Sequence, residues 1–193
     1  MTLAPWRSPL ARALHRNRSL AASRYPQLAT VKPDGRPANR TIVFRGFWSQ
    51  TNHLQFITDQ RSQKVEQLQH SAWGELCWYF GKTREQFRLA GKLSLITAAQ
   101  PDPSLASART ALWQNLSDSA RQQFAWPNPG GNWLEKPAFT PDLPDAQIPL
   151  PNFCLLLLEP TQVDHLELRG EPQNRWLYQQ QTNGEWSLKS INP

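Results

Sequence analysis

The stretch Asn39–Gly46, NRTIVFRG, is the part of the chain on which the fold assignment depends. Arg40 and Arg45 enclose three β-branched residues and a phenylalanine, and no acidic residue stands between the two arginines. β-Branched and aromatic residues favour strands, and the turn residues 33–35, Pro-Asp-Gly, predict that this strand is the second arm of a hairpin. Since side chains alternate in a regular strand, we expect the two arginines on opposite faces. Each then either extends to water or meets an anion.

Further strand patterns follow this hairpin on the way to the C-terminus. The segments are HLQFIT, GELCWYF, EQFRLAGKLSLI, FCLLLLEP, QVDHLEL, NRWLYQQ and EWSLK. Helical spacing predicts an N-terminal helix over residues 3–16 and a short helix after Ser62, which is well placed as its cap. Residues 98–151 form a helical and proline-rich insertion, with Ser104 and Ser117 as possible helix starts. The sequence therefore predicts one domain over residues 1–193, mainly β with flanking helices, as a closed antiparallel barrel with its last strands in 152–190.

Composition limits the possible functions without selecting one. The chain has 193 residues, a formal net charge of +6 and a mean hydropathy of -0.62. The positive charge favours anions, so nucleic acid, an anionic membrane surface, a phosphate-bearing cofactor and a merely solvated surface all remain open. The longest apolar run is too short to cross a bilayer, and we expect a cytoplasmic protein. Cys77 and Cys154 lie in apolar runs typical of buried free thiols, and the four histidines have no metal-ligand spacing, so no metal site is expected.

A second basic element lies where the third predicted strand runs into a helix, in ITDQRSQK. Thr58, Arg61, Ser62 and Lys64 surround the start of that helix. Free backbone N–H groups, the helix dipole and a lysine together suit a phosphate. The pattern is therefore consistent with a phosphate-binding turn.

These motifs, in their order and spacing, resemble the pyridoxamine 5'-phosphate oxidase superfamily of FMN-binding split barrels. The resemblance covers residues 27–95 and resumes in VDHLEL, NRWLYQ and EWSLKSINP, and the whole chain looks most like the cyanobacterial and plant-type branch. It implies an FMN-binding split β-barrel and a homodimer with FMN at the subunit interface. Flavin carries the redox chemistry itself, so the lack of a catalytic triad, paired carboxylates or a metal cluster is expected.

The resemblance also implies which residues contact the cofactor. The residues 40–45 correspond to the strand along the flavin, Lys64 to a phosphate ligand, and Gln63 to an arginine of the oxidase, for which Arg61 or the helix N-terminus could compensate. Gln86 corresponds to a glutamine supplied by the partner subunit. The implied FMN-binding residues are Arg40, Thr41, Ile42, Val43, Arg45, Ile57, Thr58, Ser62, Gln63, Lys64, Gln86 and Arg175.

The substrate site departs from the oxidase pattern. Leu166 stands where the oxidase has tryptophan, and the residues 171–173, Glu-Pro-Gln, stand where it has the substrate-binding Arg-x-His. Trp113 and Ser117 align poorly with the residues that hold the substrate phosphate. Arg109, Arg121 or Arg169 could supply a replacement charge. We therefore expect FMN binding with little or no oxidation of pyridoxamine 5'-phosphate, and the catalytic residues remain unassigned.

Three classes of function remain at this point. The first is an FMN-dependent oxidoreductase with an altered substrate site, and the second is a non-catalytic flavin- or haem-binding split barrel. The third is a basic barrel that binds nucleic acid through exposed aromatic side chains. Against the third, the basic residues form no single cluster and no nucleic-acid-binding motif occurs. Bound flavin after purification would favour the first two classes, and turnover would distinguish the first from the second. Salt-dependent binding of single-stranded nucleic acid would favour the third.

Overall fold

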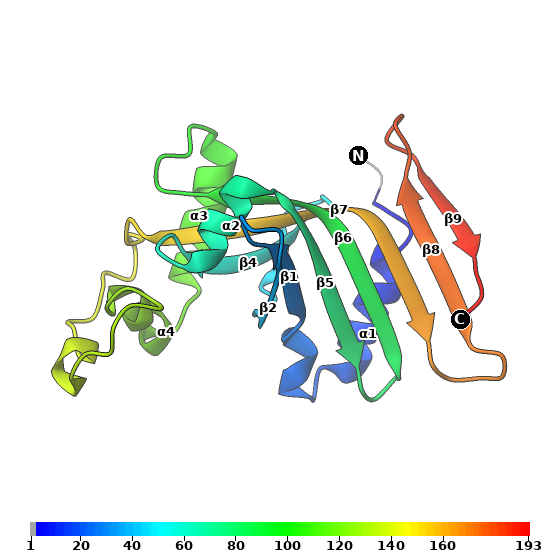
Figure 1. Ribbon diagram of the computed structural model, residues 1–193, viewed down its shortest axis with the longest axis horizontal. Helices are drawn as coiled ribbons and strands as arrows, with labels where there is room; N and C mark the ends of the chain where they lie inside the picture. The colour runs from blue at the N-terminus through cyan, green and yellow to red at the C-terminus, as the bar shows by residue number, and fades with distance from the viewer. Residues whose placement is uncertain (1–2) are drawn as a thin grey trace.

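The computed structural model describes residues 3–193, which form one antiparallel nine-stranded sheet flanked by short helices (Figure 1). The strands are β1 (Gln27–Val31), β2 (Pro37–Thr41), β3 (Gly46–Phe47), β4 (Leu54–Asp59), β5 (Trp73–Phe80), β6 (Glu85–Ile96), β7 (Phe153–Glu167), β8 (Asn174–Gln180) and β9 (Trp186–Ser190). The helices are α1 (Arg7–Asn17), α2 (Gln63–His70), α3 (Pro103–Gln114) and α4 (Asp118–Gln122), with single 3-10 turns η1 (Ala21–Arg24), η2 (Gln123–Ala125) and η3 (Lys136–Phe139).

The stretch NRTIVFRG closes this sheet into a barrel. Its first part pairs with β1 as strand β2, and the amides of Ile42 and Phe44 continue that edge by donating to the carbonyls of residues 26 and 24. The Arg45 amide then donates to the Gln55 carbonyl at 2.9 Å, and β3 pairs with β4. The ring β1-β5-β6-β7-β4 is thereby joined at its two ends, which confirms the predicted barrel.

The expected regular strand over residues 42–45 is wrong, because β2 ends at Thr41. The backbone leaves the β1 edge here to reach the β4 edge, and Gly46 adopts a φ of 127°, which residues with a side chain rarely adopt. Ile42 and Phe44 are nevertheless buried in the barrel core. Burial of these two side chains fixes the irregular segment against the core.

Strand β7 is one strand of 15 residues where the sequence predicted two. Its first half pairs with β4 and its second half with β8, while β6 pairs along its length. Pro160 falls at a register shift opposite the Ala90/Gly91 step, so the proline lies at a bulge and bends the strand without ending it. A Cβ at Gly91 would clash with the Glu159 carbonyl, so the close approach of the two strands requires glycine there.

The barrel core is aromatic and is covered at one end by α1. Trp78 stacks near Phe80 and contacts Phe44 edge-on, with ring centroids 5.3 and 4.9 Å apart. Trp6 and Leu10 from the N-terminal segment are fully buried against this core. The helix expected over 3–16 begins at Arg7 and ends at Asn17, whose side chain donates to the Ala13 carbonyl.

The insertion at 98–151 packs on β7 through a second core. Trp113, Leu116 and Phe153 are buried together there. Asp102 caps α3, instead of Ser104, and Ser117 caps α4 as predicted. Within residues 3–193, no helix has the length and apolar character needed to span a membrane.

Candidate functional site

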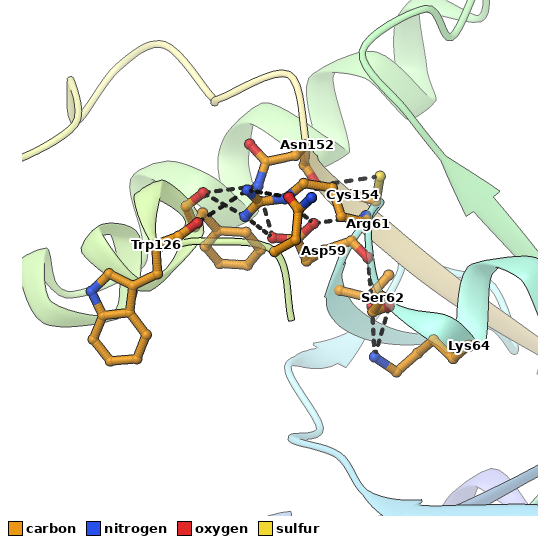
Figure 2. Close-up of polar contacts among 10 residues, drawn as sticks. Asp59, Arg61, Ser62, Lys64, Trp126, Asn152 and Cys154 are labelled. Atoms are coloured by element: carbon orange, nitrogen blue, oxygen red, sulfur yellow. Dashed lines mark hydrogen bonds and ion pairs between the residues drawn. The ribbon is translucent and has the colours of Figure 1, made fainter. Parts of the chain in front are cut away.

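The start of α2 holds a lysine between two hydroxyls. Lys64 Nζ donates to Thr58 Oγ1 at 3.0 Å and to Ser62 Oγ at 3.1 Å (Figure 2). Thr58 lies near the end of β4, and Ser62 is the N-cap residue of α2, as predicted. The Ser62 side chain makes no capping hydrogen bond, because its oxygen faces Lys64. Three of the predicted residues thus come together where a strand leads into a helix.

The surroundings of Lys64 disfavour the charged form of its ammonium group. Burial, and then the positive charge of Arg40, lower the pKa of Lys64, and Asp59 only partly opposes this. Among residues 3–193, no carboxylate lies within ion-pair distance of Lys64 or Arg40. Two neighbouring cations without an ion-pair partner within residues 3–193, beside two hydroxyls and a helix N-terminus, are an arrangement suited to a phosphate dianion.

A hydrogen-bond network fixes Arg40 beside α2. Its guanidinium donates to Thr30 Oγ1 at 2.5 Å and to Gln67 Oε1 at 2.7 Å. Thr30 Oγ1 in turn donates to Gln67 Oε1 at 2.6 Å, and both residues are buried. Partial burial lowers the pKa of Arg40. Strand β1 and helix α2 therefore orient this arginine, a role for Thr30 and Gln67 that the sequence did not suggest.

Arg61 is fully engaged elsewhere and does not replace the missing phosphate arginine. Its Nε donates to Asp59 Oδ1 at 3.0 Å and its terminal nitrogen to Asp59 Oδ2 at 2.6 Å. It also donates to the carbonyls of Phe124 and Trp126, and Asn152 Nδ2 donates to Asp59 Oδ2 at 2.8 Å (Figure 2). Arg61 therefore anchors the proline-rich loop to the end of β4.

Asp59 and Asn152 are structural residues that sequence reasoning missed. Burial alone would raise the pKa of Asp59, but hydrogen bonds from Arg61 and Asn152 hold that pKa below its ordinary value. Asp59 and Asn152 are 93 positions apart, so no local pattern indicates their contact.

The loop that follows α4 closes over the start of α2. Gly130 has a φ of +80°, and a Cβ there would lie 3.5 Å from Gln63 Nε2, so Gln63, itself exposed, faces this loop. Trp126, Trp133 and Phe139 line a hollow of about 400 Å³ beside Arg61. The residue that replaces the family arginine thus faces a glycine-rich loop and carries no charge.

Gln86 and Arg175 lie away from this cluster, on the outer face of the sheet. In the sheet, Gln86 of β6 lies opposite Tyr79 of β5 and Leu166 of β7, and Arg175 of β8 also lies opposite Leu166. Gln86 and Arg175 therefore lie on the same face of the sheet. Arg175 binds both oxygens of Asp164, at 3.0 and 2.7 Å. Tyr79 is six residues along β5 from its start near α2, about 20 Å at strand spacing. Within residues 3–193, neither Gln86 nor Arg175 forms a hydrogen bond or ion pair with Lys64.

The remaining predicted residues have separate surroundings. Ile42 is buried in the barrel core, Val43 is half-buried and Thr41 is exposed at the end of β2. Ile57 packs against the second core below α3. Burial of the Ile42 side chain leaves its backbone groups to face a cofactor, whereas the Ile57 side chain is half-buried. Arg45 makes no side-chain hydrogen bond or ion pair within residues 3–193; partial burial and then Arg24 lower its pKa.

The turn between β7 and β8 holds the residues that differ from the oxidase. Glu171 and Gln173 line an open hollow of about 760 Å³ together with Arg84 and Arg169. Arg169 donates to the Lys82 carbonyl at 2.6 Å. Of the three arginines considered as replacements, Arg169 is the one that lines this hollow.

The other two arginines are committed to the backbone of the insertion. Arg109 donates to the carbonyls of Phe153 and Leu150, at 2.8 and 2.7 Å. Arg121 donates to the Leu116 carbonyl at 2.6 Å and pairs with Asp118. Both side chains therefore stabilise the fold of the insertion.

The histidines and cysteines have ordinary structural roles in the described residues. His165 Nε2 lies 3.0 Å from a Glu85 oxygen inside the barrel, and its ring stacks on Phe87. Glu167 lies close to this pair. The sequence spacing gave no sign of this cluster, because the tertiary fold assembles it. Cys154 is buried, and Cys77, expected to be buried, is half-buried on the outer sheet face.

Comparison with known proteins identifies the family. The sequence model described as pyridoxamine 5'-phosphate oxidase, FMN-binding domain, matches residues 3–97. The pyridoxine/pyridoxamine 5'-phosphate oxidase 2 of Arabidopsis thaliana is 39% identical over 99% of this chain and 98% of its own length. The crystal structure of a pyridoxamine 5'-phosphate oxidase-related, FMN binding protein from Nostoc punctiforme is 62% identical, with a TM-score of 0.97 over the whole of both chains.

A more distant likeness supports the fold alone. PhzG from Burkholderia lata, solved with tetrahydrophenazine-1-carboxylic acid, superimposes with a TM-score of 0.80 at 19% identity, over 98% of this chain and 93% of its own. The resemblance inferred from NRTIVFRG and its surroundings is thereby confirmed. The chain belongs to the pyridoxamine 5'-phosphate oxidase family of FMN-binding split barrels, and FMN is the cofactor that this membership assigns to it.

Proposed function

We propose that the protein is an FMN-dependent oxidoreductase that holds the FMN phosphate at the start of α2. The observation that carries the proposal is the pair Lys64 and Arg40, which has no acidic partner within residues 3–193 and lies beside the hydroxyls of Thr58 and Ser62. A dianion there would relieve the repulsion between the two cations. The residues present therefore fit the cofactor.

Each of these residues has a distinct task in binding. Lys64 supplies a charge and a donor for the phosphate, and Thr58 and Ser62 orient the lysine. Arg40, fixed by its hydrogen bonds to Thr30 and Gln67, adds positive potential while it keeps those bonds. When bound, FMN supplies the electron-transfer chemistry. The experiment is a fluorescence titration of apoprotein with FMN, in which saturable binding and flavin absorbance are expected.

The two separated groups of predicted residues support a homodimer with FMN between the subunits. Within residues 3–193, neither Gln86 nor Arg175 forms a hydrogen bond or ion pair with the lysine cluster, and a second copy would bring them to the same flavin. Exposed Trp73 and Tyr79 on β5 provide apolar area suited to such an interface. Light scattering should give twice the chain mass, and a monomer with FMN fully bound would contradict the arrangement.

The substrate differs from pyridoxamine 5'-phosphate in this proposal. The β7–β8 turn presents Glu171 and Gln173 where the resemblance places an arginine and a histidine. A carboxylate repels an anionic substrate, although Arg84 and Arg169 line the same hollow. The Arabidopsis relative carries the oxidase name, so the assay is decisive. Hydrogen peroxide release on the order of 1 s⁻¹ or faster would restore the oxidase function.

A non-catalytic flavin-binding protein is the second candidate. It is favoured by the same turn, which lacks the two family residues that hold the substrate. Reduction of the bound flavin by NAD(P)H or by a candidate substrate supports the enzyme, whereas tight FMN binding without any reduction supports a carrier. A cytoplasmic location is part of the proposal, supported by the two free cysteines.

A further inference from the structure

The hollow beside Arg61 is lined by aromatic rings of the insertion. Trp126, Trp133 and Phe139 form much of its wall, and its volume is about 400 Å³. The Trp133 ring stacks on Phe139, with ring centroids 5.5 Å apart, and the Trp126 ring meets Phe139 edge-on. Trp133 is 82% exposed, so most of its surface is left uncovered by residues 3–193. An uncovered indole that lines a hollow is a stacking surface for a flat ring.

The charged groups of this hollow compensate each other. Asp59 and Arg61 are the charged residues that line it, and Arg61 donates to both carboxylate oxygens of Asp59. The exposed side-chain amides of Gln123 and Asn132 also line it. Such an amide offers a donor and an acceptor together, which matches the edge of adenine. A neutral flat ring with a hydrogen-bonding edge therefore suits this hollow better than an anion does.

The hollow borders the proposed phosphate site. Arg61 lines it and directly precedes the N-cap residue of α2. Gly130 lines it too, and a Cβ on Gly130 would lie 3.5 Å from the side-chain nitrogen of Gln63, the first residue of α2. Figure 2 shows Trp126 and Lys64 on either side of Arg61. A ligand with one phosphate at Lys64 can therefore extend past Gly130 into the hollow.

The turn between the two places carries little side-chain bulk. Residues 130 and 131 are both glycine, and Gly130 has a φ of 80°. The Gly131 amide donates to the Asn128 carbonyl at 3.1 Å, which closes the turn. Because glycine has no side chain, a ligand can approach the backbone closely here. A second phosphate and a ribose can therefore cross this turn.

We propose that the hollow binds the adenine ring of a flavin dinucleotide, FAD, whose flavin-side phosphate lies at Lys64. This inference rests on the phosphate site proposed above and extends it by one nucleotide. The adenine would stack on Trp133 and turn its edge toward the amide of Asn132 or Gln123. A volume near the lower end of small-molecule pockets suits one base with its ribose. The protein then accepts FAD as well as FMN, and binds FAD more tightly because the base adds contacts.

Calorimetric titration of the apoprotein with FMN and with FAD tests the proposal. We expect both flavins to bind, with the Kd of FAD lower than that of FMN by about five-fold or more, the effect of one stacked base. Trp133→Ala should raise the Kd of FAD to that of FMN and leave the Kd of FMN within about two-fold of wild type. Trp133→Phe keeps an aromatic face and should retain the preference for FAD.

Ile148→Ala is the matched control, because Ile148 is an exposed apolar residue of the same insertion that does not line the hollow. It should leave both Kd values unchanged. FAD that binds no more tightly than FMN overturns the proposal, as does a preference for FAD that survives in Trp133→Ala or disappears in Ile148→Ala. Loss of FMN binding in both Trp133 variants also overturns it, because the ring then supports the fold. Failure of the wild type to bind either flavin refutes the phosphate site itself, whereas FMN binding without a preference for FAD refutes this inference alone.

Discussion

Replacement of Lys64 by alanine should weaken FMN binding without weakening the fold. In the apoprotein, Lys64 is a half-buried cation near Arg40, with no carboxylate in ion-pair distance within residues 3–193. Its removal leaves the Thr58 and Ser62 hydroxyls free to bond each other, and they already lie 3.3 Å apart. The unfolding temperature of the apoprotein should therefore stay unchanged or rise slightly.

The expected loss of FMN affinity follows from one charge-assisted hydrogen bond. Such a bond to an ion contributes roughly 1.5–3 kcal/mol, which corresponds to an increase in Kd of about ten- to 150-fold. The assay is the quenching of FMN fluorescence on titration with apoprotein. Arg36→Ala is the matched control, because it removes the same charge from an exposed side chain paired with Asp34, and it should change Kd by less than about two-fold.

Arg175→Ala provides a second comparison. Arg175 donates through Nε and one terminal nitrogen to both oxygens of Asp164, so its charge is largely compensated. We expect Lys64→Ala to weaken FMN binding more than Arg175→Ala does. An unchanged Kd for Lys64→Ala, with Arg36→Ala also unchanged, would show that the phosphate lies elsewhere and would refute the assignment.

Three further predictions concern pH and stability. Because the pKa of Lys64 is lowered, the FMN affinity of the wild type should begin to fall at a lower alkaline pH than an ordinary lysine would cause. Titrations of Lys64→Ala across the same pH range should show no such fall in affinity. The lowered pKa of Asp59 contributes stability that is fully present above the unfolded pKa of about 3.9 and is lost as pH falls through the folded pKa. Asp59→Asn should therefore lower the free energy of unfolding by about 2 kcal/mol at pH 7, measured by urea unfolding. A loss that is the same at pH 3 would contradict this. Gly91→Ala should cost about 3 kcal/mol or more, because its Cβ would clash with the Glu159 carbonyl, whereas Gly81→Ala, with open space around it, should stay within about 0.5 kcal/mol in the same assay.

The strands and the start of the site were predictable because they depend on local patterns. Runs rich in apolar and aromatic residues indicate β4, β5 and β6, and the turn at Asp34-Gly35 indicates the first hairpin. The cluster of Thr58, Ser62 and Lys64 was also predictable, since a strand that runs directly into a helix places these residues together by sequence alone.

Other features depend on partners far away in the chain. The division of β7 into two strands was wrong, because the bulge opposite Gly91 lets a proline bend a paired strand without ending it. The role of Arg61 could not be read locally either, since its partners at Phe124 and Trp126 are more than 60 positions away.

The sequence by itself determined the chemistry available in NRTIVFRG: β-branched and aromatic residues with an arginine near each end and no acid between them. Only the tertiary structure decided what each arginine does. Arg40 is held by Gln67 beside the lysine of α2, while Arg45 lies near Arg24 at the other end of β1. The reason is that the segment exchanges its hydrogen-bond partner from β1 to β4 to close the barrel, and that exchange depends on strands distant in sequence.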